Sequence, residues 1–116
     1  MRYMLLIFGP EDEFPAQGTP EFAAAMQEYF DFSRDLRAAG IMNGGEELDS
    51  SVTATTVRVR DGNAMLTDGP FVETKEQIGG YYIIDVPNLD EAIRWAARIP
   101  GARTGAIEVR PIIEHE

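Results

Sequence analysis

Two stretches of the chain carry apolar side chains at both odd and even positions, residues 2–8 and residues 78–86. Successive side chains of a β-strand point to opposite faces of its sheet, so an ordinary surface strand alternates between apolar and polar residues. A strand that is apolar on both parities has both of its faces covered. The pattern therefore predicts two central strands in these stretches.

A helical pattern fills residues 20–39, between a polar loop at 9–19 and Gly40. Thr19 is a suitable N-cap, Pro20 suits the first helical position, and Gly40 is typical of a helix end. The helix face expected to pack on the sheet is Phe22, Met26, Tyr29, Phe30, Ser33 and Leu36.

A second helical pattern begins after Asn88, which can cap a helix, and stops at the Pro-Gly pair of residues 100–101. Its expected apolar stripe is Leu89, Ala92, Ile93, Ala96 and Ile99. Trp95 lies beside this stripe, so we expect it to serve packing.

The remaining segments predict shorter strands. Residues 41–48 contain a Gly-Gly pair and predict an irregular strand, whereas 52–60 is β-branched and alternating. Residues 61–63, Asp-Gly-Asn, predict a hairpin turn into a return strand at 64–67, and a last strand is expected at 106–113. This order predicts an α+β, ferredoxin-like βαββαβ domain with an extra hairpin and both helices on one face of the sheet.

Two helices cover only one face of such a sheet, while the central strands are apolar on both. Burying each large apolar side chain contributes about 1.5–3 kcal/mol, so an uncovered face would drive association. The simplest cover is a second copy packed sheet to sheet about a two-fold axis. We therefore expect a homodimer.

Composition narrows the function classes. The chain has 116 residues, enough for one domain over 1–116, and a formal net charge of -10 that disfavours nucleic acid as a partner. It contains no cysteine, which excludes thiolate metal sites and a cysteine nucleophile. No stretch is apolar for the roughly 20 residues that span a bilayer, so we expect a cytoplasmic protein with no membrane partner. No phosphate-binding loop, dinucleotide motif or serine–histidine triad is present, and no cofactor is expected.

Turn-forming and ionisable residues are densest in residues 67–81. Asp68 precedes a Gly-Pro pair, where an aspartate typically initiates a turn. Phe71 is expected to plug the core, and Gly79 and Gly80 to permit close backbone packing. Alternation in an extended segment places Glu73 and Lys75 on one face.

An adjacent acid and amine in a partly dry cavity could act as general acid and base, which makes Glu73, Lys75 and Asp68 candidate catalytic residues. The same side chains, if exposed, form only a weak surface ion pair, and the structural interpretation of the motif is favoured. Candidate ligand contacts are Phe71, Tyr81 and Arg58. A carboxylate metal site is possible at Glu46, Glu47 and Asp49 or at Asp68 with Glu73, but the spacing matches no calcium loop, so no metal is expected.

The segments Asp-Gly-Pro-Phe at 68–71, Glu-Thr-Lys-Glu at 73–76 and Gly-Gly at 79–80 resemble the signature of the DGPF proteins, a branch of the YCII-related family. The likeness extends to Arg-Tyr-Met-Leu-Leu-Ile at 2–7, Leu-Arg-Ala-Ala-Gly at 36–40, Thr-Thr-Val-Arg at 55–58 and Asp-Glu-Ala at 90–92. The resemblance implies a dimeric α/β barrel, in which two ferredoxin-like sheets face each other around a cavity.

The resemblance implies less about activity. DGPF proteins are largely uncharacterised and are often encoded beside extracytoplasmic-function sigma factors. Wider YCII-related proteins are proposed to use a His–Asp pair, and relatives on the same barrel include muconolactone isomerases and small-aromatic monooxygenases. The single histidine of this chain is His115, the penultimate residue, so no such pair is carried over.

Three functions follow as hypotheses. The first is a dimer that binds a small organic ligand in its barrel cavity, with catalysis left open. The second is a regulatory or stress-associated protein that binds a partner such as a sigma factor. The third is a cofactor-free oxygenase or isomerase acting on small aromatics. Ligand binding is favoured because the barrel offers a cavity and the motif places charge near its rim.

Overall fold

The computed structural model describes residues 1–115 and contains two α-helices and six β-strands. In chain order they are β1 (Arg2–Pro10), α1 (Pro20–Ala38), β2 (Met42–Glu47), β3 (Thr55–Arg60), β4 (Asn63–Asp68), β5 (Glu76–Asp85), α2 (Leu89–Ala96) and β6 (Ala106–Pro111). Short 3-10 turns span Glu11–Glu13, Ser51–Thr53 and Pro100–Arg103.

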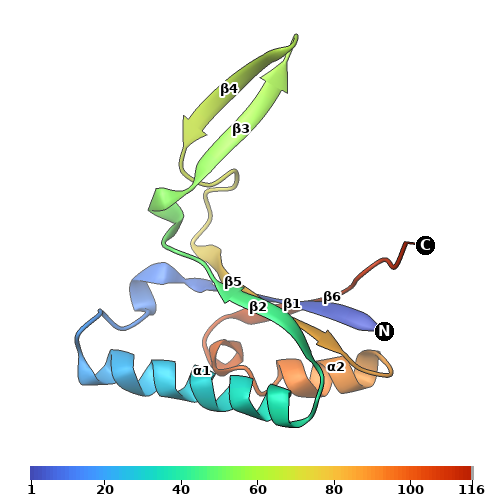
Figure 1. The fold of residues 1–116 in the computed structure, drawn as a ribbon. Helices are drawn as coiled ribbons and strands as arrows, with labels where there is room; N and C mark the ends of the chain where they lie inside the picture. Colours follow the sequence, from blue (N-terminus) through green and yellow to red (C-terminus); the bar gives the residue numbers. More distant parts are fainter. Residues whose placement is uncertain (116) are drawn as a thin grey trace.

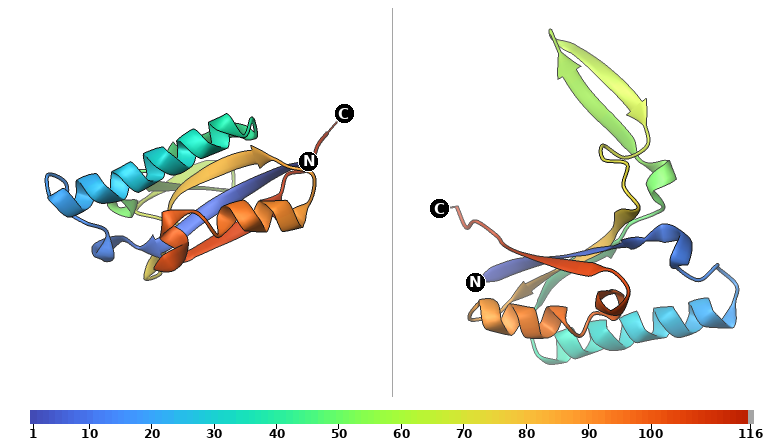
Figure 2. Two further views of the ribbon diagram at one scale, coloured as in Figure 1. Left: turned by 90° about the horizontal axis from the view of Figure 1, so that it is seen from below. Right: turned by 180° about the vertical axis from the view of Figure 1, so that it is seen from behind.

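Four strands form one antiparallel sheet in the order β2-β5-β1-β6, with β1 and β5 in the centre. Both helices lie on the same face of this sheet, so the domain has two layers (Figures 1 and 2). The α+β, ferredoxin-like prediction is therefore confirmed, including two central strands at 2–8 and 78–86.

The helix ends follow the local chemistry that predicted them. Thr19 accepts a hydrogen bond from the backbone N–H of Phe22 at 3.1 Å, and Asn88 accepts one from Glu91 at 3.0 Å. Gly40, directly after the α1 cap, has a φ of 72°, a left-handed conformation in which glycine carries little strain.

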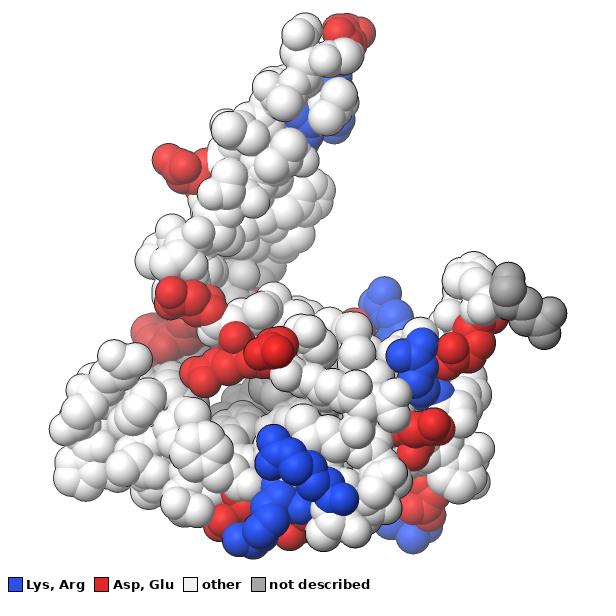
Figure 3. Space-filling model, in the orientation of Figure 1, with Lys and Arg blue, Asp and Glu red and all other residues white. Residues whose placement is uncertain are grey.

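The buried core lies between the helices and one end of the sheet. Its members are Tyr3, Leu5, Phe32, Leu36, Tyr82, Ile84, Val86, Ala92, Ala96 and Ile99. In α1 only Phe32 and Leu36 are buried, so the predicted packing face was wrong for Phe30, which is 59% exposed. The first half of α1 stands over a hollow instead of over packed side chains (Figure 3).

The stripe predicted for the second helix is also only partly correct. Ala92, Ala96 and Ile99 are buried, whereas Leu89 and Ile93 are about half exposed. Small alanine side chains allow a helix to approach the sheet closely, and Ile93, one position after the buried Ala92, turns toward solvent. Trp95 packs against Phe32 as a T-shaped pair at 6.1 Å, which confirms its packing role.

Strands β3 and β4 form a separate two-stranded sheet, the arm (residues 55–68), which projects away from the body (Figure 1). Asp61 and Gly62 at its tip have φ angles of 51° and 77°, as expected for the predicted hairpin turn. The arm begins later than predicted, because residues 51–53 turn into a 3-10 helix. Every residue of β4 is exposed.

The face of the sheet opposite the helices is apolar along its two central strands, while the edge strands add Glu46, Glu108 and Arg110. Its apolar side chains come from alternate positions of the two central strands, which pair in register: Met4, Leu6, Phe8, Ile78, Tyr81 and Ile83. We call this set the open face. Within residues 1–115 no helix is long and apolar enough to cross a membrane.

Candidate functional site

The segment that resembles the DGPF signature, residues 68–80, connects the arm to β5. Its turn at Gly69 is hydrogen-bonded to the base of the arm. The backbone N–H of Gly69 donates to the carbonyl of Ala54 at 2.7 Å, and the Thr56 hydroxyl donates to the carbonyl of Gly69 at 2.8 Å. Gly69 has a φ of 97°, a backbone conformation that would be strained in a residue with a side chain. This turn is therefore well explained by structure alone.

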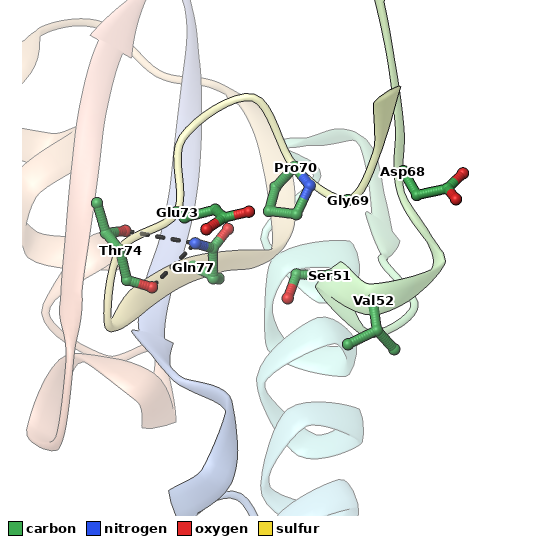
Figure 4. A pocket seen from close by; sticks show the side chains of 8 residues that line it. All are labelled: Ser51, Val52, Asp68, Gly69, Pro70, Glu73, Thr74 and Gln77. Carbon is green, nitrogen blue, oxygen red and sulfur yellow. Dashed lines mark hydrogen bonds between the residues drawn. The ribbon is translucent and has the colours of Figure 1, made fainter. Parts of the chain in front are cut away.

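A pocket of about 400 Å³ lies beside this turn (Figure 4). The Gln77 amide donates to the carbonyls of Val72 and Thr74 at 2.9 and 3.0 Å and shapes its floor. The lining residues are Ser51, Val52, Asp68, Gly69, Pro70, Glu73, Thr74 and Gln77.

The three candidate catalytic residues do not converge in this chain. Asp68 and Glu73 both line the pocket, but the carboxylate of Asp68 points away from it (Figure 4). Lys75 is exposed and lies outside the lining, and it forms no ion pair with Glu73 in the described chain. Residues 69–75 are irregular, so the strand-like alternation expected to put Glu73 beside Lys75 is not present.

Phe71 was expected in the core, and that prediction is wrong: its side chain is 69% exposed. Its ring packs under the guanidinium of Arg58, 5.0 Å from the ring centroid, so two candidate ligand contacts bind each other. An exposed cation–π pair of this kind contributes about 0.5–1 kcal/mol. Tyr81 lies apart from both, half-buried on the open face opposite Leu6 of β1.

A larger hollow, the helix-side cavity, lies between the first half of α1 and the sheet and has a volume of about 800 Å³. Phe22, Met26 and Tyr29 of α1 face it, and Gly45 and Gly80 line it from β2 and β5. The two glycines lie on the helix-facing side of the sheet, next to Tyr82 in register. The absence of side chains at these positions leaves α1 nothing to pack against there.

Neither glycine can carry a side chain without disturbing the sheet. A Cβ at Gly45 would lie 2.9 Å from the carbonyl oxygen of Tyr81, and one at Gly80 would lie 2.8 Å from that of Glu46. The expected close packing is therefore confirmed for Gly80. At Gly79 it is wrong, because no atom lies within 4 Å and the residue is the extra one at a register shift between β1 and β5.

Three hydroxyl groups supply polar contacts inside the helix-side cavity. Ser33 and Tyr82 share a hydrogen bond of 2.9 Å, and Tyr29 lies beside Gly101. Burial raises the pKa of Tyr29 and of Tyr82 above the usual value of 10.0, because the phenolate would lose hydration. Both hydroxyls therefore stay protonated at neutral pH. Tyr29 can donate a hydrogen bond to a ligand, and so can whichever hydroxyl of the Ser33–Tyr82 pair accepts the bond between them.

The sequence reasoning missed this cavity. Its signal was present, since two Gly-Gly pairs stand in neighbouring strands and the first half of α1 is apolar. The pairing of β2 with β5, however, is a long-range fact that no local pattern supplies.

Comparison with known proteins places the chain in a family. The YCII-related domain matches residues 1–116. The chain belongs to the YCII-related family. It is also 35% identical over 114 residues to an uncharacterised protein of Rhizobium meliloti (strain 1021), covering 97% of this chain and 92% of that protein.

In this YCII-related protein the only histidine lies away from both pockets. His115 is exposed, follows the end of β6, and forms no ion pair with any described residue. Within residues 1–115 no group of three or more carboxylate or histidine side chains is placed to hold a metal ion. The chemistry on offer is therefore an apolar cavity with hydroxyl donors and a charged rim.

Proposed function

We propose that this YCII-related protein binds a small organic ligand in the helix-side cavity. The observation that supports this is the cavity itself, about 800 Å³ in volume, within the range of small-molecule sites. Its wall is mainly apolar, and the hydroxyls of Ser33, Tyr29 and Tyr82 offer a few placed hydrogen bonds. Small-molecule sites commonly combine these two features.

A thermal-shift screen against small aromatic acids, amines, alcohols, quinols and lactones tests the proposal. A ligand is expected to raise the melting midpoint of the wild type, and of Glu73→Ala and Lys75→Ala, because these motif side chains lie outside the cavity. Met26→Trp is expected to reduce the shift, because the larger ring takes up part of the ligand's space beside α1, while its circular dichroism stays that of the wild type.

The motif variants make the screen decisive between two sites. If the shift disappears in folded Glu73→Ala or Lys75→Ala and stays at its wild-type size in Met26→Trp, the ligand binds at the motif and the cavity proposal is overturned. No shift with any compound would overturn ligand binding itself.

We also propose that the protein is a homodimer of the DGPF branch, whose second copy covers the open face and the arm. Val57 and Leu66 pair across the arm, and both are more than half exposed. An isolated two-stranded hairpin is marginally stable in water, so an apolar arm gains from packing on another surface. Proton transfer by Asp68, Glu73 and Lys75, and ligand contact by Phe71, Tyr81 and Arg58, stay predictions for the barrel cavity of such a dimer.

Light scattering at micromolar concentration is expected to give twice the mass of one chain. Leu66→Asp is expected to shift the mass to that of a monomer, because it places a charge in the apolar surface of the arm. Asn63→Asp adds the same charge at the polar tip and is expected to leave the dimer intact. A monomeric wild type, or equal masses for the two variants, would contradict the proposal.

A further inference from the structure

Aromatic rings dominate the wall of the helix-side cavity at the start of α1. Phe14 and Phe22 meet edge to face, with ring centroids 5.9 Å apart and planes at 90°. Tyr29 and Phe30 continue the wall along α1, and Tyr82 bounds it on the sheet. The face of an aromatic ring carries partial negative charge and attracts cations.

Carboxylates dominate the charged groups of the same cavity. Five line it, against the single guanidinium of Arg37, and acidic side chains gather along the sheet-side rim of the hollow (Figure 3). They are Glu11, Glu13, Glu46, Glu47 and Asp49, of which Glu46 lies at the edge of the sheet with its side chain on the same side as its partner Tyr81. In residues 1–115 none of the five forms an ion pair with a cationic side chain. Glu11 accepts hydrogen bonds from the backbone N–H and the hydroxyl of Ser51, and Asp49 accepts one from the backbone N–H of Ser50, but these donors are neutral.

Arg37 does not reverse this balance. The lining holds this one guanidinium against five carboxylates, and Arg37 forms no ion pair with any of them in residues 1–115. The excess of carboxylates therefore remains, on a chain whose formal net charge is -10. A cleft lined by one sign of charge concentrates ligands of the opposite sign and repels those of its own.

We propose that the ligand of the helix-side cavity is an organic cation, an apolar group that carries a protonated or quaternary amine. This rests on the proposed function. The apolar group lies against Phe22 and Met26, and the ammonium lies toward the carboxylate rim and the aromatic faces. The rim carboxylates are exposed to water, so an ammonium group that lies beside them stays partly hydrated. It therefore needs no buried counter-charge.

The test is calorimetric titration with three probes of equal length: phenylbutylamine, phenylbutanol and phenylbutyrate. The amine is expected to bind about tenfold more tightly than the alcohol, and the carboxylate is expected to bind most weakly. Raising the ionic strength is expected to reduce the preference for the amine while leaving the affinity for the alcohol nearly unchanged, because salt screens exposed charges.

Variants that neutralise one carboxylate test whether the preference for the amine arises at the cavity. Glu47→Gln is expected to lower the affinity for the amine by about threefold or more and to leave the alcohol unaffected, since only the cation interacts with the lost charge. Asp90→Asn removes a carboxylate at the start of α2, outside the cavity lining, and is the matched control with unchanged affinities.

The outcomes separate the two proposals. If the alcohol or the carboxylate binds as tightly as the amine, the cationic class is overturned while ligand binding stands. If none of the three probes binds and the thermal-shift screen is also empty, the proposed function falls, and this inference falls with it.

Discussion

A Phe32→Ala variant is expected to lose about 3–5 kcal/mol of unfolding free energy. Phe32 is only 4% exposed, and its ring packs edge-on against Tyr82 at 5.2 Å and against Trp95 at 6.1 Å. It therefore joins α1 to the sheet and to α2 at one point. Truncation removes the apolar contacts of all three elements and leaves a void that the rigid sheet fills poorly.

Phe30→Ala is the matched control, because it makes the same change two residues away on the same helix. Phe30 is 59% exposed at the cavity, so its loss is expected to change stability by less than about 0.5 kcal/mol. Urea unfolding of both variants, analysed with a common slope, measures the difference. Equal losses would contradict the assignment of Phe32 to the core and Phe30 to the surface.

A Gly105→Ala variant is expected to lose about 3 kcal/mol or more, at the upper end of overpacking effects. The added Cβ would overlap the carbonyl oxygen of Phe8 and lie 2.9 Å from the Cα of Gly9. Both are backbone atoms of β1, at the point where Phe8 pairs with Ala106 of β6. Relief therefore requires β1 and β6 to separate at that end.

Gly79→Ala provides the comparison, since nothing lies within 4 Å of its added Cβ and its φ is not left-handed. Its unfolding free energy is expected to change by no more than about 1 kcal/mol. The same urea experiment applies to both variants. A Gly105→Ala protein as stable as the wild type would show that residue 105 does not approach β1 closely.

The candidate motif illustrates how far sequence reasoning reached at the site. Its turn chemistry was predictable, because Asp68 before a Gly-Pro pair and a left-handed Gly69 are local features. The contacts that its side chains make were not predictable from the sequence. Phe71 packs on Arg58 of the arm instead of entering the core, and Glu73 and Lys75 lie in an irregular segment with no shared face. Those placements depend on where the arm projects.

The sequence by itself determined the order of helices and strands, the helix caps, the hairpin turn, the apolar central strands and the ferredoxin-like class, since each depends on side-chain periodicity or on residues a few positions apart. Tertiary structure decided which apolar side chains are buried and where a cavity forms. Gly45 and Gly80 are 35 positions apart, yet the pairing of β2 with β5 sets them beside Tyr82 under α1. The hollow exists because that register brings two missing side chains together, and sheet register is a property of the whole fold.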